Sequence, residues 1–196
     1  ARELFRFIPF ELLENLASFS SNDPAPTGEP LIYGLDSTWT VFRFDAWKEC
    51  SPGIFCKDDT ITADPNPSYP NSDFVFTYGG MRRGGNNYYS LDVSSVNGQL
   101  DAADIKPKFQ FAILGGAQNP PIANYPYENM GQTWSQPELG QINVGGIRTP
   151  VIIFAGGYDD KYDDADQVDN NVVDKGSAVY IVDAMTGKSW VPLWSA

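Results

Sequence analysis

The chain has 196 residues, 42% of them hydrophobic and 14% aromatic, and its 25 acidic and 13 basic residues give a net charge of −12. This length allows one sizeable core or two small ones, and the acidic balance argues against nucleic-acid and anionic membrane partners, which bind to basic faces. The chain has no histidine and no apolar run long enough for a spanning helix, so we expect a non-enzymatic chain with no membrane span and no typical zinc or copper site.

The N-terminal region predicts one strand and one short helix. Residues 3–10, "ELFRFIPF", alternate between apolar and polar side chains and predict a strand. In the following "PFELLENLASF", the side chains of Leu12, Leu13, Leu16 and Phe19 fall on one helical face, and Pro9 suits the first helical turn. A linker rich in Pro, Ser and Asp covers residues 20–30.

From residue 31 onward the sequence is nearly all β, with Gly, Asn and Asp marking the turns. Four strands are expected in residues 31–46, 72–80, 86–93 and 106–114. Four more are expected in residues 135–144, 149–157, 177–184 and 189–196.

The two groups of strands repeat one another. "FTYGG" at residues 76–80 matches "IFAGG" 77 residues later, and "YYSLDV" at residues 88–93 matches "VYIVDA" 91 residues later. Repeated four-stranded meanders are typical of β-propellers, which close with about 4–8 blades. We therefore predict an all-β fragment of a larger propeller, with two four-stranded blades, the outer strand of a third and one short helix. A compact two-sheet β domain is the alternative.

The predicted organisation divides one propeller fragment into three parts. Residues 1–30 hold the end of one blade, the helix and the linker. Residues 31–118 form a blade whose long insertion contains Cys50 and Cys56, and residues 119–196 form a blade with an acidic insertion. The two cysteines flank a Pro-Gly turn, so they either form a disulfide or remain two free thiols; a disulfide would imply an oxidising compartment.

The acidic insertion suggests a calcium site. Residues 156–176 contain seven aspartates among 21 residues. Calcium takes 6–8 oxygen ligands at irregular spacing, and the candidate ligands are Asp159, Asp160, Asp163, Asp164, Asp166 and Asp169. The alternative is an exposed, solubilising loop in which Lys161 and Lys175 pair locally with carboxylates at small energetic gain.

Other residues have both a structural and a functional interpretation. "MRRGGNN" at residues 81–87 places two arginines beside glycines and could bind an anion, but a hairpin loop requires Gly and Asn in any case. Asp92 and Asp183 end equivalent strands and are interpreted as turn formers that accept backbone N–H groups. Four tryptophans are assigned to the core, a carbohydrate platform being the alternative: Trp39, Trp134, Trp190 and Trp194.

Five segments, in this order and spacing, resemble a known family. They are "RELFRFIPFELLENL", "YGLDSTWTV", "GGMRRGGNNYYSLDV", "TWSQPELGQI" and "GSAVYIVDAMTGK". Together they are similar to the C-terminal propeller of the PilY/PilC family, the tip-associated adhesins and biogenesis factors of bacterial type IV pili. The third segment followed by "TWSQP" is the most specific part of the resemblance.

The resemblance implies a secreted protein at the pilus tip, outer membrane or periplasm of a Gram-negative bacterium. It would support pilus assembly, oppose retraction and mediate adhesion, with pilus subunits or minor pilins and a host or abiotic surface as partners. Some members carry a D-x-[DN]-x-[DN]-G calcium loop. The acidic insertion does not contain it, because Val168 and Val173 stand at the fifth position of the two D-x-[DN] registers.

Two other hypotheses remain open at this stage. A quinoprotein-type dehydrogenase propeller needs a bound quinone, calcium and a catalytic aspartate. The adjacent cysteine pair associated with many such enzymes is absent, because five residues separate Cys50 from Cys56. A purely structural set of blades would leave adhesion and pilus number unchanged when it is lost.

Overall fold

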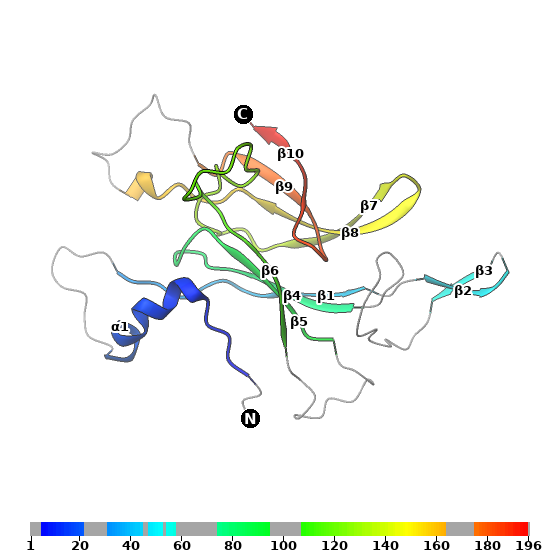
Figure 1. The fold of residues 1–196 in the computed structure, drawn as a ribbon, viewed down its shortest axis with the longest axis horizontal. Coiled ribbons are helices and arrows are strands. Elements are labelled where there is room, and N and C mark those ends of the chain that lie inside the picture. The colour runs from blue at the N-terminus through cyan, green and yellow to red at the C-terminus, as the bar shows by residue number, and fades with distance from the viewer. Residues whose placement is uncertain are drawn as a thin grey trace.

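The computed structural model describes residues 5–21, 31–44, 47–52, 54–57, 74–94, 107–163 and 175–195. Two four-stranded sheets dominate it, each an antiparallel meander (Figure 1). The first sheet has the order β1 (Thr40–Phe44), β4 (Phe74–Gly80), β5 (Tyr88–Asp92), β6 (Lys108–Ile113). The second has the order β10 (Ser189–Ser195), β9 (Ala178–Asp183), β8 (Ile147–Ala155), β7 (Glu138–Val144).

The two predicted meanders and their strand order are confirmed. The first predicted strand, residues 31–46, is wrong for residues 31–39, which form no strand, because β1 begins only at Thr40, where it pairs with β4. Within the described residues no sheet closes on itself, so the propeller, and with it the three-part division at residues 30 and 118, stays a prediction. Two sheets of this kind are consistent with two blades of a partial propeller. No helix in the described part of the chain is both long and apolar enough to cross a membrane.

The insertion of the first repeat begins with a short hairpin, β2 (Trp47–Ser51) and β3 (Ile54–Lys57). Cys50 lies in β2, and Cys56 lies in β3 opposite Lys48. The side chains of both cysteines are outside the described residues, so the disulfide stays a prediction.

The predicted N-terminal strand is wrong for residues 5–9, which form no strand. Phe7 instead packs edge-on against Trp39 and Tyr89, with ring centroids 6.0 and 5.5 Å apart. The segment therefore covers the outer face of the first sheet. Alternating side chains produce a strand only where a neighbouring strand supplies backbone partners.

The predicted helix is present as a 3-10 helix, η1 (Phe10–Asn15), followed by α1 (Leu16–Ser21). Pro9 precedes its first turn, as expected. Leu12 is buried against Met81 and Tyr89, whereas Leu13, Leu16 and Phe19 stay exposed. The apolar face of the helix is therefore only partly buried by the described residues.

The main core lies between the two sheets, which face one another (Figure 1). From Phe74 to Tyr78 in β4 buried and half-buried residues alternate, because successive side chains of a strand point to opposite faces. Tyr88 of the first sheet meets Phe154 of the second with ring centroids 4.4 Å apart, and Phe154 stacks on Tyr180 at 5.5 Å. Aromatic contacts thus join the two repeats.

Buried hydroxyls also connect the two repeats. Tyr78 of β4 donates a hydrogen bond of 2.7 Å to the carbonyl of Ala184, in the turn after β9. That turn is held by Asp183, whose carboxylate accepts the backbone N–H groups of Met185 and Thr186 at 3.0 and 2.9 Å. Asp92 accepts the N–H of Ser94 in the same way, at 2.8 Å, so the turn-forming role predicted for both aspartates is confirmed.

The Tyr78 hydrogen bond generates a stability prediction. Tyr78→Phe leaves the carbonyl of Ala184 buried without this partner, and we expect it to lower the free energy of unfolding by about 1–2 kcal/mol. Tyr180→Phe is the matched control, because the equally buried Tyr180 makes no hydrogen bond through its hydroxyl within the described residues. Denaturant unfolding measures both variants; equal losses would contradict the assignment.

The buried tyrosines predict sensitivity to alkali. Burial raises the pKa of Tyr78, Tyr88, Tyr89 and Tyr127 above the ordinary value of about 10. The unfolded chain therefore loses these protons at a lower pH than the folded chain. The free energy of unfolding should be insensitive to these groups below about pH 10 and should fall as the pH rises further. Denaturant unfolding with tyrosinate absorbance tests this; ionisation of all tyrosines in the intact fold would refute it.

Candidate functional site

The two repeats meet at an extended strip, residues 131–134, which we call the junction strip. On one side it pairs with the loop 81–87 between β4 and β5, and on the other with residues 156–158 after β8. Gly131 N–H donates to Gly156 at 2.9 Å, and Gln132 and Tyr158 exchange two backbone hydrogen bonds of 2.7 and 3.0 Å. The strip therefore holds loops from both sheets together.

Thr133 makes the central contacts of the strip. Its side chain is buried, and its hydroxyl oxygen accepts the backbone N–H groups of Met81 and Arg82 at 2.7 and 2.9 Å. Its own N–H donates to the carbonyl of Gly85 at 3.1 Å. A Cβ on Gly80 would lie 2.7 Å from the Thr133 hydroxyl oxygen, so glycine is required there for the approach.

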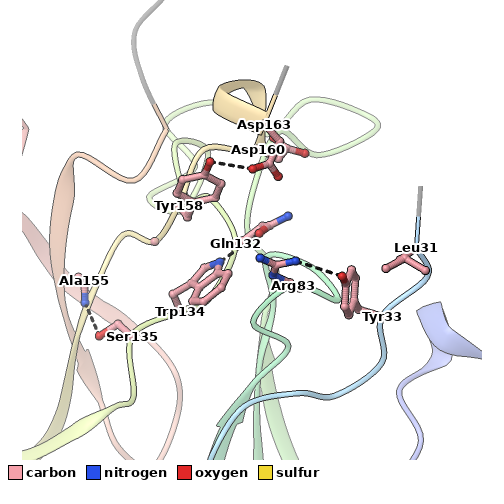
Figure 2. Close-up of a pocket in the computed structure, with 11 residues that line it drawn as sticks. Leu31, Tyr33, Arg83, Gln132, Trp134, Ser135, Ala155, Tyr158, Asp160 and Asp163 are labelled. Carbon is pink, nitrogen blue, oxygen red and sulfur yellow. Dashed lines mark hydrogen bonds between the residues drawn. The ribbon is translucent and has the colours of Figure 1, made fainter. Parts of the chain in front are cut away.

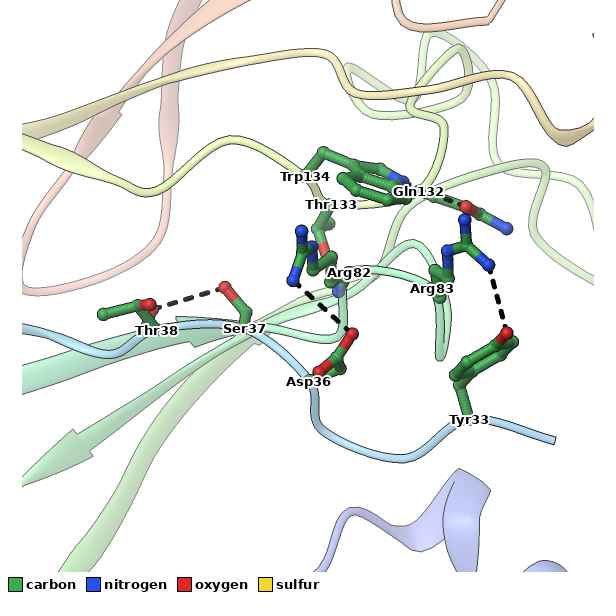
Figure 3. A network of polar contacts seen from close by, with 9 residues as sticks. All are labelled: Tyr33, Asp36, Ser37, Thr38, Arg82, Arg83, Gln132, Thr133 and Trp134. Carbon is green, nitrogen blue, oxygen red and sulfur yellow. Dashed lines mark hydrogen bonds and ion pairs between the residues drawn. The ribbon is translucent and has the colours of Figure 1, made fainter.

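The segment before β1 joins the same loop. The N–H of Asp36 donates to the carbonyl of Met81 at 3.4 Å, and its carboxylate lies 3.7 Å from a guanidinium nitrogen of Arg82 (Figure 3). A Cβ on Gly84 would overlap the carbonyl oxygen of Gly34. The backbone of residues 33–36 is therefore packed directly against the arginine–glycine loop.

The N-terminal helix is anchored to the end of this loop. Glu11 accepts hydrogen bonds from the amide of Asn87 and the hydroxyl of Tyr89, both at 3.0 Å. The carbonyl oxygen of the Asn87 side chain accepts the N–H of Gly115 at 3.0 Å. The loop, the helix and the chain after β6 thus share one set of polar contacts.

A groove with a volume of about 940 Å³ opens beside the junction strip (Figure 2). We call it the junction groove. Residues from both repeats line it: Leu31, Tyr33, Arg83, Gln132, Trp134, Ser135, Ala155, Gly157, Tyr158, Asp160 and Asp163. Its position between two sheets is typical of binding sites, which favour the boundaries between packed units.

One wall of the groove is cationic and aromatic. The guanidinium of Arg83 lies 5.4 Å from the ring centroids of both Tyr33 and Trp134, and it donates a hydrogen bond of 3.0 Å to the Tyr33 hydroxyl. That bond raises the pKa of Arg83. Arg82 lies 4.5 Å from the Trp134 centroid, between this ring and Asp36 (Figure 3). Trp134 is therefore fixed by two cation–π contacts.

The opposite wall is acidic. The hydroxyl of Tyr158 donates to the carboxylate of Asp163 at 2.9 Å, which raises the pKa of Tyr158. Asp160 is exposed and lies 3.8 Å from the ammonium group of Lys175. The wall includes η2 (Asp160–Asp163), the short 3-10 turn that begins the acidic insertion. The groove thus places one guanidinium opposite two carboxylates.

The structure describes three of the six predicted calcium ligands. Asp159 is buried and accepts the backbone N–H groups of Lys161 and Lys175, at 3.2 and 2.9 Å, which joins the two ends of the insertion. Asp160 and Asp163 have the partners given above. No three acidic, cysteine or histidine side chains gather in a metal-binding arrangement among the described residues. Asp164, Asp166 and Asp169 lie outside them, so the calcium site stays a prediction.

The tryptophan assignments differ in outcome. Trp39 packs against the outer face of the first sheet, as expected for core. The assignment of Trp134 to the core is wrong, because it lines the groove with 38% of its surface exposed, and Trp190 is similarly exposed at 37%. The side chain of Trp194 is outside the described residues. Neither Tyr33 nor Thr133 could be identified from the sequence, because a single aromatic or hydroxyl residue carries no spacing signal.

Comparison with known proteins gives a distant structural relation. No family model matches the chain, and no curated protein matches its sequence. The chain is similar to the solved structure of the Pseudomonas aeruginosa PilY1 C-terminal domain, with 16% identity and a TM-score of 0.46 over 96% of this chain. The chain spans about a quarter of the length of that solved chain. A relation at this distance identifies neither a function nor a partner.

The junction strip predicts that the Thr133 hydroxyl is important for stability. Thr133→Val keeps the shape but leaves the buried N–H of Met81 and the part-buried N–H of Arg82 without an acceptor, and we expect it to lower the free energy of unfolding by about 2–3 kcal/mol. Thr133→Ser keeps the hydroxyl and should lose less than half of that. Thermal or denaturant unfolding tests the pair; a valine variant as stable as the serine variant would show that the hydroxyl is dispensable.

Proposed function

We propose that this chain is a non-enzymatic part of a secreted type IV pilus protein that acts in pilus assembly, retraction control and surface adhesion. It would work at the pilus tip, outer membrane or periplasm of a Gram-negative bacterium. Its contacts would be with pilus subunits or minor pilins and with a host or abiotic surface. The lack of histidine in the sequence supports contact rather than catalysis.

The observation that carries the proposal is the convergence of the resembling segments. "YGLDSTWTV" contacts "GGMRRGGNNYYSLDV" through Asp36 and Arg82, and the latter contacts "TWSQPELGQI" through Thr133. "RELFRFIPFELLENL" reaches the same loop through Glu11.

The fifth segment, "GSAVYIVDAMTGK", begins in the same neighbourhood, because Gly176 donates to Asn129, just before the strip, at 2.8 Å. Residues that contact one another must be complementary in size, charge and hydrogen bonding. A resemblance spread over such residues is therefore less easily produced by chance than one spread over unconnected positions.

The proposal predicts a pilus phenotype in the bacterium that encodes the chain. Deleting the gene should reduce the number of surface pili, twitching motility and adhesion. If the protein opposes retraction, pili should return when the retraction motor is also removed, although adhesion should stay low. Sheared pilin, electron microscopy and adherence assays measure these three effects.

Complementation provides the control. The wild-type gene and Thr133→Ser should restore pili, whereas Thr133→Val should restore them less well, because a loss of about 1–2 kcal/mol or more can change abundance several-fold in cells. Normal piliation and adhesion in the deletion strain would refute the proposal. An intrinsic quinone absorption band in the purified protein would instead favour the dehydrogenase alternative.

A further inference from the structure

We propose that the junction groove binds an acidic sugar, meaning a glycan unit with one carboxylate and several hydroxyl groups. The carboxylate would pair with Arg83, and the hydroxyls would donate to Asp160 and Asp163. This inference deepens the adhesive part of the proposed function and rests on it for its biological setting. The groove geometry itself does not depend on that function.

The first support is the state of Arg83. Its side chain is exposed and donates to the Tyr33 hydroxyl, and no carboxylate of the described residues lies within ion-pair distance of it. Its neighbour Arg82, in contrast, has Asp36 at 3.7 Å. A guanidinium carries five N–H donors and binds carboxylates through two parallel bonds. The donors that Tyr33 leaves free are therefore suited to a carboxylate on a ligand.

The second support is the mixture of charges along the groove. A polyanion such as nucleic acid would meet the exposed carboxylates of Asp160 and Asp163, and the net charge of −12 would repel it. A bare metal cation would face Arg83. A ligand with one negative charge and several neutral hydroxyl donors avoids both conflicts, because carboxylates accept hydrogen bonds from hydroxyl groups.

The third support is the rigid aromatic surface between the two walls. The indole N–H of Trp134 donates to the Gln132 side chain at 3.0 Å, and its ring meets that of Tyr158 edge-on at 6.2 Å (Figure 2). The bond engages the carbonyl of Gln132 and leaves its amide group available as a donor. Fixed aromatic rings suit the apolar C–H face of a sugar and lower the entropy cost of binding.

A peptide is the main competing ligand, and the backbone of the groove argues against it. One common mode of peptide recognition adds a strand to unpaired N–H and C=O groups. Here Gln132 and Tyr158 pair with each other, and the N–H of Ala155 donates to the Ser135 hydroxyl at 3.1 Å. Recognition in this groove is left to side chains, which suits a glycan.

Calorimetric titration of the purified protein tests the proposal with three probes: sialyllactose and methyl galacturonide, which each carry one carboxylate, and neutral lactose. We expect saturable binding of at least one acidic probe and none of lactose. The two acidic probes separate a sialylated surface from a uronate polysaccharide as the source. Arg83→Gln should weaken the binding at least about tenfold, because it removes a charge-assisted pair.

Arg83→Lys keeps the charge without the planar fork and should recover only part of the affinity. Arg148→Gln is the matched control, because Arg148 is exposed in β8, outside the groove, and it should bind like the wild type. Equal thermal stability of the three variants would show that folding is unaffected.

Several outcomes would overturn the inference: no heat with either acidic probe at millimolar concentration, equal binding of lactose, or full affinity in Arg83→Gln. Binding of mixed-charge peptides that Arg83→Gln abolishes would assign the groove to a protein partner instead. Glycan binding in a protein whose deletion leaves piliation normal would refute only the proposed pilus function. Loss of pili without glycan binding would refute only this inference.

Discussion

The hydroxyl of Thr133 is the contact on which the arrangement of the two repeats depends. One buried oxygen accepts the N–H groups of Met81 and Arg82, in the loop of the first sheet. The adjacent residue, Gln132, exchanges backbone hydrogen bonds with Tyr158 beyond the second sheet. Because buried polar groups are costly when unpaired, the loops are constrained to this one alignment. The aromatic core between the sheets adds burial energy, which is much less directional.

The same strip also produces the groove. Thr133 is buried, whereas the neighbouring side chains of Gln132 and Trp134 line the groove. The ring of Trp134 contacts Arg82 and Arg83, which belong to the loop that the Thr133 hydroxyl holds. It also contacts the ring of Tyr158, which the backbone hydrogen bonds between Gln132 and Tyr158 bring alongside the strip. Stability and a potential binding surface thus come from one short stretch of chain. The surface is rigid because its support is buried.

The acidic insertion shows how one residue type can serve different purposes within a few positions. Asp159 is buried and closes the two ends of the insertion through backbone hydrogen bonds, whereas Asp160 and Asp163 face the groove. The number of carboxylates does not distinguish these roles. Calcium binding by the rest of the insertion stays a prediction, and the described aspartates have protein partners of their own.

The sequence by itself determined the eight strands of the two meanders, to within their ends, and the aspartate turns, because strand alternation and turn formation depend on residues close together in the chain. Only the tertiary structure decided that residues 5–9 form no strand, that Trp134 is exposed and that Arg83 lies between two aromatic rings. Each of these features depends on a contact with a residue distant in the sequence. The ring of Phe7 packs against that of Trp39, and Arg83 donates a hydrogen bond to Tyr33, 50 residues before it. Such contacts leave no periodic pattern in a single sequence, so the groove could not have been predicted from it.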